Sequence, residues 1–414
     1  MNKESAPRRM NDLEVTRTTD CLEGVRIALC VGGGVAAIES PRVVRELRRM
    51  GARVKVFATE NALRFVGRDA LEWASTLPVI SSSTGLAEHI ASSEDMVVVL
   101  PATADLIAKS ALGICPDACT TFIQSALGLK LPVFFCPTMH DSLRDSPAFV
   151  KNLELLSSYP AVELLQPRIE EGKWKSPSPE GLALELAHRY NRIRRMRDGR
   201  AQAKALVTLG GTLVPIDAAR AICNFSTGVL GSMVVKRLLE QGVEVVALCG
   251  SMQVSLPECT GLKTFSTPFF DQLSAWLSDE TKTKDFGALF HLAAISDYAP
   301  ETPSTEKIPS DALELELNLR KLPKLIELPS LSKIPFRFAC KLTSGNSTQE
   351  MEKAISLLEK MNLNGIYWNW SETAFGSHRN HAGFLIDKSR RQTEIDSKSA
   401  AALAITKFYM EQCG

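Results

Sequence analysis

The stretch VTLGGTLVPIDAARAICNFSTGVLG, residues 207–231, decides the fold of the second half of this chain. An apolar segment ends in Gly210-Gly211-Thr212, and a second turn, Ser226-Thr227-Gly228, opens an amphipathic segment. A strand, a glycine turn and a helix start in this order predict an α/β unit whose free backbone N–H groups hold a phosphate. Many α/β proteins use such a turn only to change direction, so the motif alone leaves both interpretations open.

The composition is that of an ordinary globular protein. The 414 residues suffice for two or three domains, and 45% of them are hydrophobic and 23% charged. The net charge of +1 excludes bulk attraction to nucleic acid or to a membrane surface. No apolar run approaches the ~20 residues that span a bilayer. Ten cysteines without metal-site spacing predict reduced thiols and a cytoplasmic protein.

The first part of the chain alternates between strand and helix patterns, after a polar segment, residues 1–22, that predicts a disordered tail. Strands are expected at 25–31, 53–58, 95–100, 131–136 and 162–165, and one helix at 35–50. The alternation predicts βαβ units and a parallel sheet. Ligands of such sheets bind beyond the carboxyl ends of the strands, which indicates three loops, at 32–37, 59–62 and 101–105.

These loops carry a family resemblance. They read GGGVAA, TENA and PATAD, and residues 113–121 read GICPDACTT. Over residues 23–167 the chain resembles the flavoprotein family that contains phosphopantothenoylcysteine decarboxylase. The resemblance implies an FMN cofactor bound by Gly34, Ala36, Thr59, Pro101, Ala102, Thr103 and Ala104. The alternative is a flavodoxin-like sheet that binds no cofactor, and Glu39 departs from the family's usual lysine nearby.

The same resemblance implies residues for decarboxylation. His89 matches the catalytic histidine, and His140 stands where the family has an asparagine that contacts the substrate carboxylate. The alternatives are a surface histidine at 89 and a solvated helix start at 140. The family's flap carries a cysteine that reprotonates the ene-thiol. The equivalent stretch here, EEGKWKSPSP at 170–179, contains no cysteine.

The second half repeats the alternation after a helical pattern at 179–197 and a linker at 198–203, so a second domain is expected at 204–414. Strands are expected at 205–209, 243–248 and 288–294, and helices at 230–241 and 270–278. His291 falls inside an expected strand and is interpreted as a core histidine. The segment LELELNL, residues 313–319, predicts a strand with one buried face. The fold class is therefore α/β, with two three-layer, Rossmann-like or flavodoxin-like domains in tandem.

The pattern GGT-x-x-x-ID-x-x-R-x-I-x-N-x-STG-x-x-G resembles the nucleotide-binding opening of phosphopantothenate–cysteine ligases, and AAISDYAP at 293–300 resembles their AAVxDY-x-P signature. The resemblance implies that Asn224 polarises the acyl carbonyl and that Lys307 stabilises the charged intermediate. Preorganised donors of this kind stabilise charge that develops during amide formation. The implied contacts to nucleotide and substrate are Gly210, Gly211, Thr212, Asp297 and Phe338. Lys341 departs from the family's usual glutamate.

Together the two resemblances imply a bifunctional protein of coenzyme A biosynthesis. Its expected substrates are 4′-phosphopantothenate and cysteine, with CTP or ATP as the nucleotide and Mg²⁺ arriving with the phosphates rather than at a protein metal site. The family implies homo-oligomers, with trimeric flavin domains and dimeric ligase domains. Two alternatives stay open: a ligase whose flavin domain is only an assembly scaffold, and a non-enzymatic flavoprotein that regulates a partner.

Overall fold

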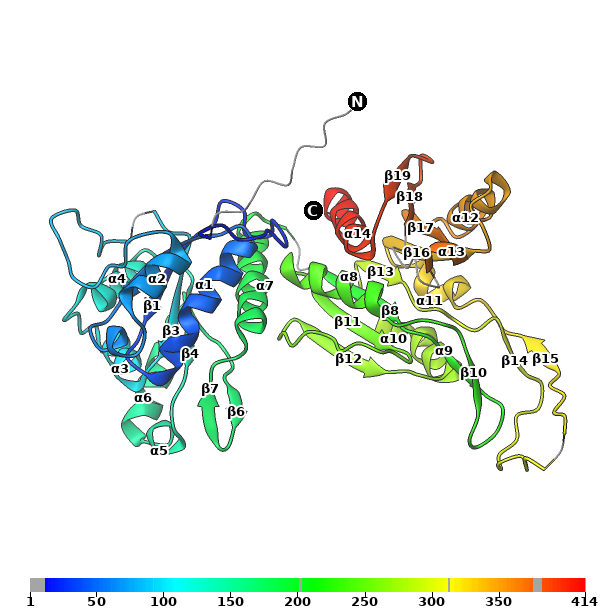
Figure 1. The fold of residues 1–414 in the computed structure, drawn as a ribbon, viewed down its shortest axis with the longest axis horizontal. Helices are drawn as coiled ribbons and strands as arrows, with labels where there is room; N and C mark the ends of the chain where they lie inside the picture. Colours follow the sequence, from blue (N-terminus) through cyan, green and yellow to red (C-terminus); the bar gives the residue numbers. More distant parts are fainter. Residues whose placement is uncertain (1–11, 92, 201–202, 312, 375–381, 414) are drawn as a thin grey trace. The chain divides into compact units, whose positions relative to one another are not determined.

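The computed structural model describes residues 12–413 except 92, 201–202, 312 and 375–381 (Figure 1). The chain forms two units, of which the first ends at Tyr190 and the second begins at Asn191. The division falls within helix α7 (Pro179–Arg197). The expected linker, 198–203, begins where α7 ends, and two of its residues lie outside the described chain.

The first unit is a parallel sheet covered by helices. Its strands are β1 (Arg26–Val31), β2 (Arg53–Ala58), β3 (Met96–Ala102), β4 (Val133–Pro137) and β5 (Val162–Leu164), in the order β2-β1-β3-β4-β5. Its helices are α1 (Ser40–Arg49), α2 (Arg68–Ser75), α3 (Ala104–Leu112), α4 (Ala118–Gly128), α5 (Asp141–Arg144) and α6 (Pro147–Ser157), with two 3₁₀ turns, Val35–Glu39 and Ala62–Arg64. Every residue of β3 is buried, as expected of a central strand. An antiparallel hairpin, β6 (Arg168–Glu170) and β7 (Lys173–Lys175), precedes α7.

Two expectations for the first unit need correction. The single helix expected at 35–50 is a 3₁₀ turn followed by α1, because Pro41 has no N–H to donate and favours the first turn of a helix. Residues 1–11 of the expected disordered tail, 1–22, lie outside the described chain. Its last part packs on the unit: Leu22 is fully buried, and its N–H donates to the Met50 carbonyl at 2.9 Å.

The second unit holds an eight-stranded sheet in the order β12-β11-β8-β13-β16-β17-β18-β19. The strands are β8 (Lys204–Leu209), β11 (Glu244–Cys249), β12 (Leu262–Ser266), β13 (Ala288–His291), β16 (Phe336–Thr343), β17 (Gly365–Trp370), β18 (Gly383–Asp387) and β19 (Gln392–Ile395). The first six in this spatial order pair in parallel, whereas β18 and β19 are antiparallel. The predicted α/β class with parallel sheets is thus confirmed, with an antiparallel edge that the sequence analysis missed.

Helices and two short ribbons complete the second unit. The helices are α8 (Val229–Glu240), α9 (Phe270–Ser278), α10 (Glu280–Thr283), α11 (Pro329–Ser332), α12 (Thr348–Lys360), α13 (Ser371–Ala374) and α14 (Lys398–Cys413), with the 3₁₀ turn η3 (Leu325–Glu327). The ribbons pair β9 (Leu213–Pro215) with β10 (Ala221–Cys223), and β14 (Tyr298–Pro300) with β15 (Leu319–Lys321). Within the described residues, no helix is long and apolar enough to cross a membrane.

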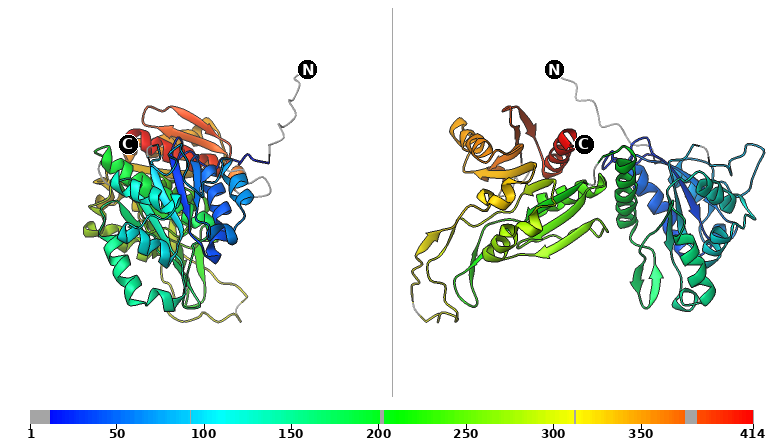
Figure 2. Two further views of the ribbon diagram at one scale, coloured as in Figure 1. Left: turned by 90° about the vertical axis from the view of Figure 1, so that its left-hand side faces the viewer. Right: turned by 180° about the vertical axis from the view of Figure 1, so that it is seen from behind.

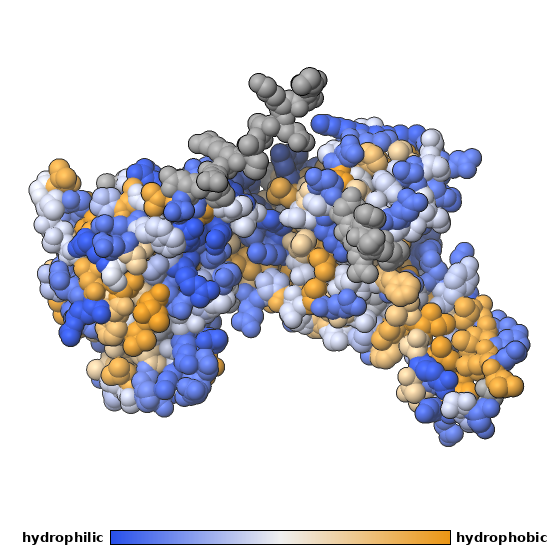
Figure 3. All heavy atoms as spheres, viewed as in Figure 1, coloured by the Kyte–Doolittle hydropathy of each residue, from blue (hydrophilic) through white to orange (hydrophobic). Residues whose placement is uncertain are grey.

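The chain between β14 and β15 projects from the sheet of the second unit, and we call residues 298–321 the arm (Figures 1 and 2). The predicted strand at 313–319 is wrong, because only Leu319 belongs to a strand, and residues 313–318 have no strand partner. The leucines are therefore not on a buried face. Figure 3 shows the apolar surface of the arm, to which Leu313, Leu315, Leu317, Leu319 and Tyr298 contribute exposed side chains.

Candidate active sites

A cavity of about 1050 Å³ lies in the first unit, beyond the carboxyl ends of its parallel strands. The loops after β1, β2, β3 and β4 form its wall together with the hairpin β6–β7. Five of the predicted FMN residues line it, namely Gly34, Ala36, Thr59, Thr103 and Ala104. The other two, Pro101 and Ala102, are buried at the end of β3, directly before Thr103, and are not among the described residues of the wall.

The wall has the donors and the space that a phosphorylated cofactor needs. The Thr59 hydroxyl accepts a hydrogen bond from the Ala62 N–H at 3.2 Å, and the Thr103 hydroxyl accepts one from the Leu106 N–H at 3.3 Å. Both hydroxyls thus have fixed positions on the cavity wall. Gly34 has extended backbone, and a Cβ added there would be in ordinary contact with Thr103 Cγ2, at 3.5 Å, and Pro101 Cγ, at 4.0 Å. A larger side chain at Gly34 would fit its backbone but fill the cavity.

The hairpin β6–β7 is held against this cavity by the backbone of Trp174. Its N–H donates to the Met139 carbonyl and its carbonyl accepts from the Met139 N–H, both at 3.0 Å. Three cations of the hairpin, Arg168, Lys173 and Lys175, line the cavity. No cysteine is among the described lining residues. Cys136 lies nearby but is fully buried, and burial raises the pKa of its thiol to about 12.

The structure separates the two histidines that were predicted to act together. His140 lines the cavity and caps α5, where its Nδ1 accepts the Ser142 N–H at 3.3 Å and faces the Asp141 carboxylate. His89 is not among the described residues that line the cavity. Its Nδ1 is buried and has no hydrogen-bond partner in the described part of the chain. One copy of the chain therefore does not bring His89 to the predicted site.

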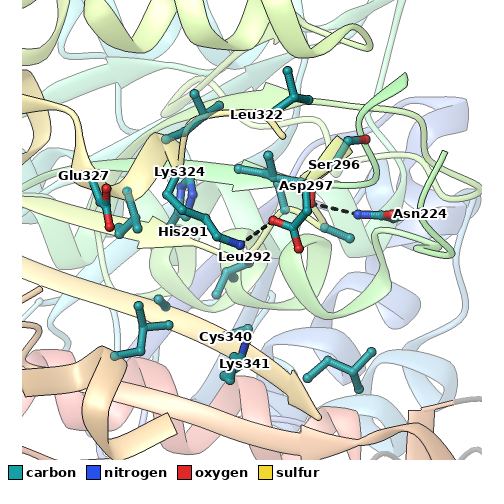
Figure 4. A pocket seen from close by; sticks show the side chains of 18 of the residues that line it. Asn224, His291, Leu292, Ser296, Asp297, Leu322, Lys324, Glu327, Cys340 and Lys341 are labelled. Carbon is teal, nitrogen blue, oxygen red and sulfur yellow. Dashed lines mark hydrogen bonds and ion pairs between the residues drawn. The ribbon is translucent and has the colours of Figure 1, made fainter. Parts of the chain in front are cut away.

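A second cavity, of about 1380 Å³, lies in the second unit beyond the ends of β13, β16 and β17 (Figure 4). Two of the predicted site residues, Asn224 and Asp297, line it. The Asn224 side chain is exposed, and its Nδ2 donates a hydrogen bond to the Ile295 carbonyl at 2.8 Å. Asp297 forms an ion pair with Lys324, and Figure 4 shows both side chains inside the cavity.

The glycine turn has a different role from the predicted one. The Gly211 N–H donates to the Ser251 carbonyl at 2.9 Å, and the Thr212 N–H donates to the Ala294 carbonyl at 3.1 Å. These amides are used inside the fold, so they do not hold a phosphate. A Cβ on Gly211 would lie 2.8 Å from the Asn224 carbonyl oxygen. Glycine is therefore required here because the two backbone segments pack closely. Gly210, Gly211 and Thr212 are not in the described cavity wall.

Phe338 is also displaced from its predicted role. Its side chain is fully buried in β16, with its ring centroid 6.3 Å from those of Phe290 and Phe408. It does not line the cavity, because the strand alternation turns it to the other face of the sheet. Phe338 is a core residue.

We therefore expect Phe338→Ala to act on stability rather than on ligand binding. Removing a buried phenylalanine costs about 3–5 kcal/mol of unfolding free energy. Urea denaturation of the second unit measures this loss, and the KM for nucleotide should stay within twofold in Phe338→Leu, which retains most of the volume. A large rise of the KM for nucleotide in a fully folded Phe338→Leu protein would indicate that Phe338 contributes to nucleotide binding.

Lys307 lies on the arm and is exposed, outside the described cavity wall. The next residue fixes the chain here: the Ile308 N–H donates to Asp217 Oδ2 at 3.0 Å, and Arg220 donates to the Ile308 carbonyl. Within one copy, the structure does not bring Lys307 to Asn224 and Asp297.

The second cavity also contains residues that the sequence analysis did not find. Its wall has five lysines but only two carboxylates, Asp297 and Glu327, and is therefore strongly cationic. The lysines are Lys321, Lys324, Lys341, Lys353 and Lys360. They come from the arm, the residue before η3, β16 and α12, so only the fold brings them together. Among the described residues there is no group of three or more histidine, cysteine, aspartate or glutamate side chains that could hold a metal ion.

Comparison with known proteins bears on both units. A family model described as Flavoprotein matches residues 15–189, and one described as DNA/pantothenate metabolism flavoprotein C-terminal domain matches residues 200–411. The coenzyme A biosynthesis bifunctional protein CoaBC of Thermococcus kodakarensis is 32% identical over 368 residues, which cover 87% of this chain and 88% of the relative. The CoaBC of Mycobacterium bovis is 34% identical over 297 residues, 68% of this chain and 69% of the relative.

The first family model spans the unit with the β6–β7 hairpin, and the second spans the unit with the lysine-rich cavity. Their order along the chain is the order that the two motif resemblances predicted. The predicted family is thus confirmed, and the chain belongs to the CoaBC family of bifunctional coenzyme A biosynthesis proteins.

Proposed function

We propose that the second unit joins 4′-phosphopantothenate to cysteine in its cavity, with CTP as the nucleotide. The observation that carries this proposal is the placement of the Asn224 amide and five lysines on one cavity wall. A nucleoside triphosphate and a phosphorylated carboxylate are both polyanions, and a wall with an excess of cations favours them.

The chemistry uses these groups in sequence. The carboxylate attacks the α-phosphorus of the nucleotide and pyrophosphate leaves. The cysteine amine then attacks the acyl carbonyl, the nucleoside monophosphate leaves, and the amine loses a proton. Lysines stabilise the charge on the phosphate oxygens, and an amide N–H stabilises the carbonyl oxygen as it becomes an oxyanion. The carboxylates Asp297 and Glu327 are paired with Lys324 and Lys360, so Mg²⁺ would enter with the nucleotide and be held mainly by its phosphates.

We further propose that the first unit binds FMN and decarboxylates the ligation product. FMN, when bound, supplies the oxidation of the cysteinyl group that makes loss of carbon dioxide possible. Thr59 and Thr103 would hold the cofactor phosphate and its neighbouring atoms, and the hairpin cations Arg168 and Lys175 would hold an anionic group of the substrate. His140 would donate a hydrogen bond to the departing carboxylate.

A ligase with a flavin unit that serves only as a scaffold is the second candidate, and one observation favours it. No described residue that lines the first cavity is a cysteine, and His89 lies outside that wall. Purified protein incubated with phosphopantothenate, cysteine, Mg²⁺ and either CTP or ATP separates the two candidates. Mass spectrometry then measures ligation and carbon dioxide loss independently, and the preferred nucleotide in the same assay.

We expect the purified protein to be yellow, because the hydroxyls and the open Gly34 backbone leave room for FMN. Gly34→Val should release the cofactor, since its side chain occupies the cavity while its extended backbone accepts any residue. The flavin absorbance after gel filtration, relative to protein, measures retention.

Gly85→Val is the matched control, because a Cβ at Gly85 has no neighbour within 4 Å and Gly85 is outside the cavity wall. It should remain yellow. Colourless wild-type protein that takes up no added FMN would contradict the cofactor assignment and leave the first unit as a scaffold.

The arm supports the expected homo-oligomer. Its exposed leucines, 313, 315, 317 and 319, form an apolar surface of the kind that marks protein–protein contacts. We propose that a second copy of this chain covers the arm in a dimer, and that trimers form through the first unit as in the family. Sedimentation of the wild type and of a Leu315→Asp, Leu317→Asp double variant tests the dimer contact.

A further inference from the structure

His291 is a buried polar side chain at the floor of the ligase cavity. It is the last residue of β13, only 9% exposed, and it lines the cavity with residues of η3 and β16. The strand alternation places it on the same face as Leu289, whereas Phe290 packs on the opposite face against Phe336. His291 was expected to be a core histidine. Its ring is buried, but one edge borders the cavity (Figure 4).

Thr208 fixes the tautomer of this ring. The Thr208 hydroxyl lies 3.2 Å from His291 Nδ1, and the same oxygen accepts the Ala293 N–H at 3.3 Å. Thr208 is fully buried, and no other described acceptor is available for its hydroxyl proton. A buried hydroxyl must donate that proton, and Nδ1 is the acceptor within reach. Nδ1 is thus unprotonated in the neutral ring, and Nε2 carries the hydrogen.

The ring is also uncharged at physiological pH, because burial lowers the pKa of His291 to about 4. A neutral imidazole adds nothing to the attraction of phosphates, which the lysines already provide. Its contribution is a directed N–H donor. No described residue accepts a hydrogen bond from Nε2, and this nitrogen is not among the buried side-chain atoms that lack a partner, so it is open to the cavity.

We propose that His291 is a ligand-binding residue of the ligase cavity and that its Nε2–H donates to an uncharged acceptor of a bound ligand. The acceptor is a carbonyl oxygen or ring nitrogen, which the nucleotide base and the pantothenate amide both offer. This inference rests on the proposed ligase function. Thr208 is a positioning residue in it, since it acts only through the tautomer of His291. Sites that donate a specific hydrogen bond discriminate strongly against ligands without the matching acceptor.

The two amide substitutions of His291 test the proposal in the full-length protein. Glutamine places a donor near the position of Nε2, whereas asparagine places its amide near Nδ1 and can restore only the contact with Thr208. We expect His291→Leu to raise the Kd and KM of one ligand by about tenfold or more, the usual effect of losing a buried hydrogen bond. His291→Gln should recover most of that loss and His291→Asn little.

Calorimetric titration with CTP, ATP and 4′-phosphopantothenate identifies the source of the acceptor, because only one of these affinities should fall. His188→Leu is the control, since His188 is also buried but lies in the first unit and is not among the described residues that line either cavity. It should lower the melting temperature without changing any Kd. Unchanged affinities for all three ligands in folded His291→Leu, or rescue by asparagine equal to that by glutamine, would overturn the proposal. A wild type that ligates but shows no calorimetric binding would also overturn it, and a wild type that neither ligates nor binds would overturn the ligase assignment itself.

Discussion

Asn224→Ala is expected to lower the ligation rate by about 10²–10³-fold, the usual cost of removing one donor to a developing oxyanion. An asparagine amide has two N–H donors, and one of them is fixed on the Ile295 carbonyl at 2.8 Å. That bond orients the second N–H toward the cavity without reorganisation during the reaction. Initial rates of product formation, measured by mass spectrometry, give the effect.

Asn224→Asp is the matched control, because it has almost the same size but no N–H donor. It should be as slow as the alanine variant, and both should retain the melting temperature of the wild type since the side chain is exposed. A wild-type ligation rate in either variant would show that Asn224 does not contribute to catalysis.

We expect Lys307→Ala to lower the ligation rate as much as Asn224→Ala does, because the arm would bring Lys307 to the cavity of the second unit. Because the arm holds Lys307 outside the cavity wall of its own chain, mixing the inactive Asn224→Ala and Lys307→Ala proteins distinguishes two arrangements. Recovered activity places Lys307 in the cavity of a second copy. A mixture that stays inactive indicates that Lys307 acts in the cavity of its own chain. A Lys307→Ala protein that ligates at the wild-type rate excludes both arrangements.

The sequence predicted the parallel sheets well because continuous apolar strands leave few alternatives. β1, β2 and β3 lie within a residue or two of their expected bounds. The segment 313–319 failed for a physical reason: alternation shows which side chains could share a buried face, but not whether a neighbouring strand exists to pair with. Its leucines are exposed on the arm instead.

Sequence motifs pointed to those site residues that lie in a single loop. Asn224 and Asp297 lie in recognisable motifs, and both reach the cavity. The glycine turn was predicted to hold a phosphate together with the following helix start, whereas the fold uses the Gly211 and Thr212 amides for the Ser251 and Ala294 carbonyls. The lysine wall and His291 could not be predicted, since they meet only after β13, β16 and α12 are assembled.

The missing flap thiol is expected to make decarboxylation incomplete in the wild-type protein. After carbon dioxide leaves, the ene-thiol has to gain a hydride, which reduced FMN would supply, and a proton at carbon. A positioned general acid is worth about 10²–10⁴-fold. The described cavity wall offers lysines on the hairpin but no cysteine, and the Cys136 thiol is buried with its pKa raised to about 12. We expect the ene-thiol product to accumulate more rapidly than phosphopantetheine forms.

Lys173→Cys should correct this defect, because Lys173 lies on the hairpin and lines the cavity. The hairpin itself is held by the neighbouring Trp174 backbone, which the substitution leaves in place. We expect phosphopantetheine formation to rise by about 10²-fold or more in Lys173→Cys, and to stay at the wild-type level in the control Lys173→Ala. Efficient turnover by the wild type, at a rate that matches ligation, would refute the missing-acid argument. A further loss in Lys173→Ala would then identify Lys173 as the proton donor, since its ammonium group is the acid that the substitution removes.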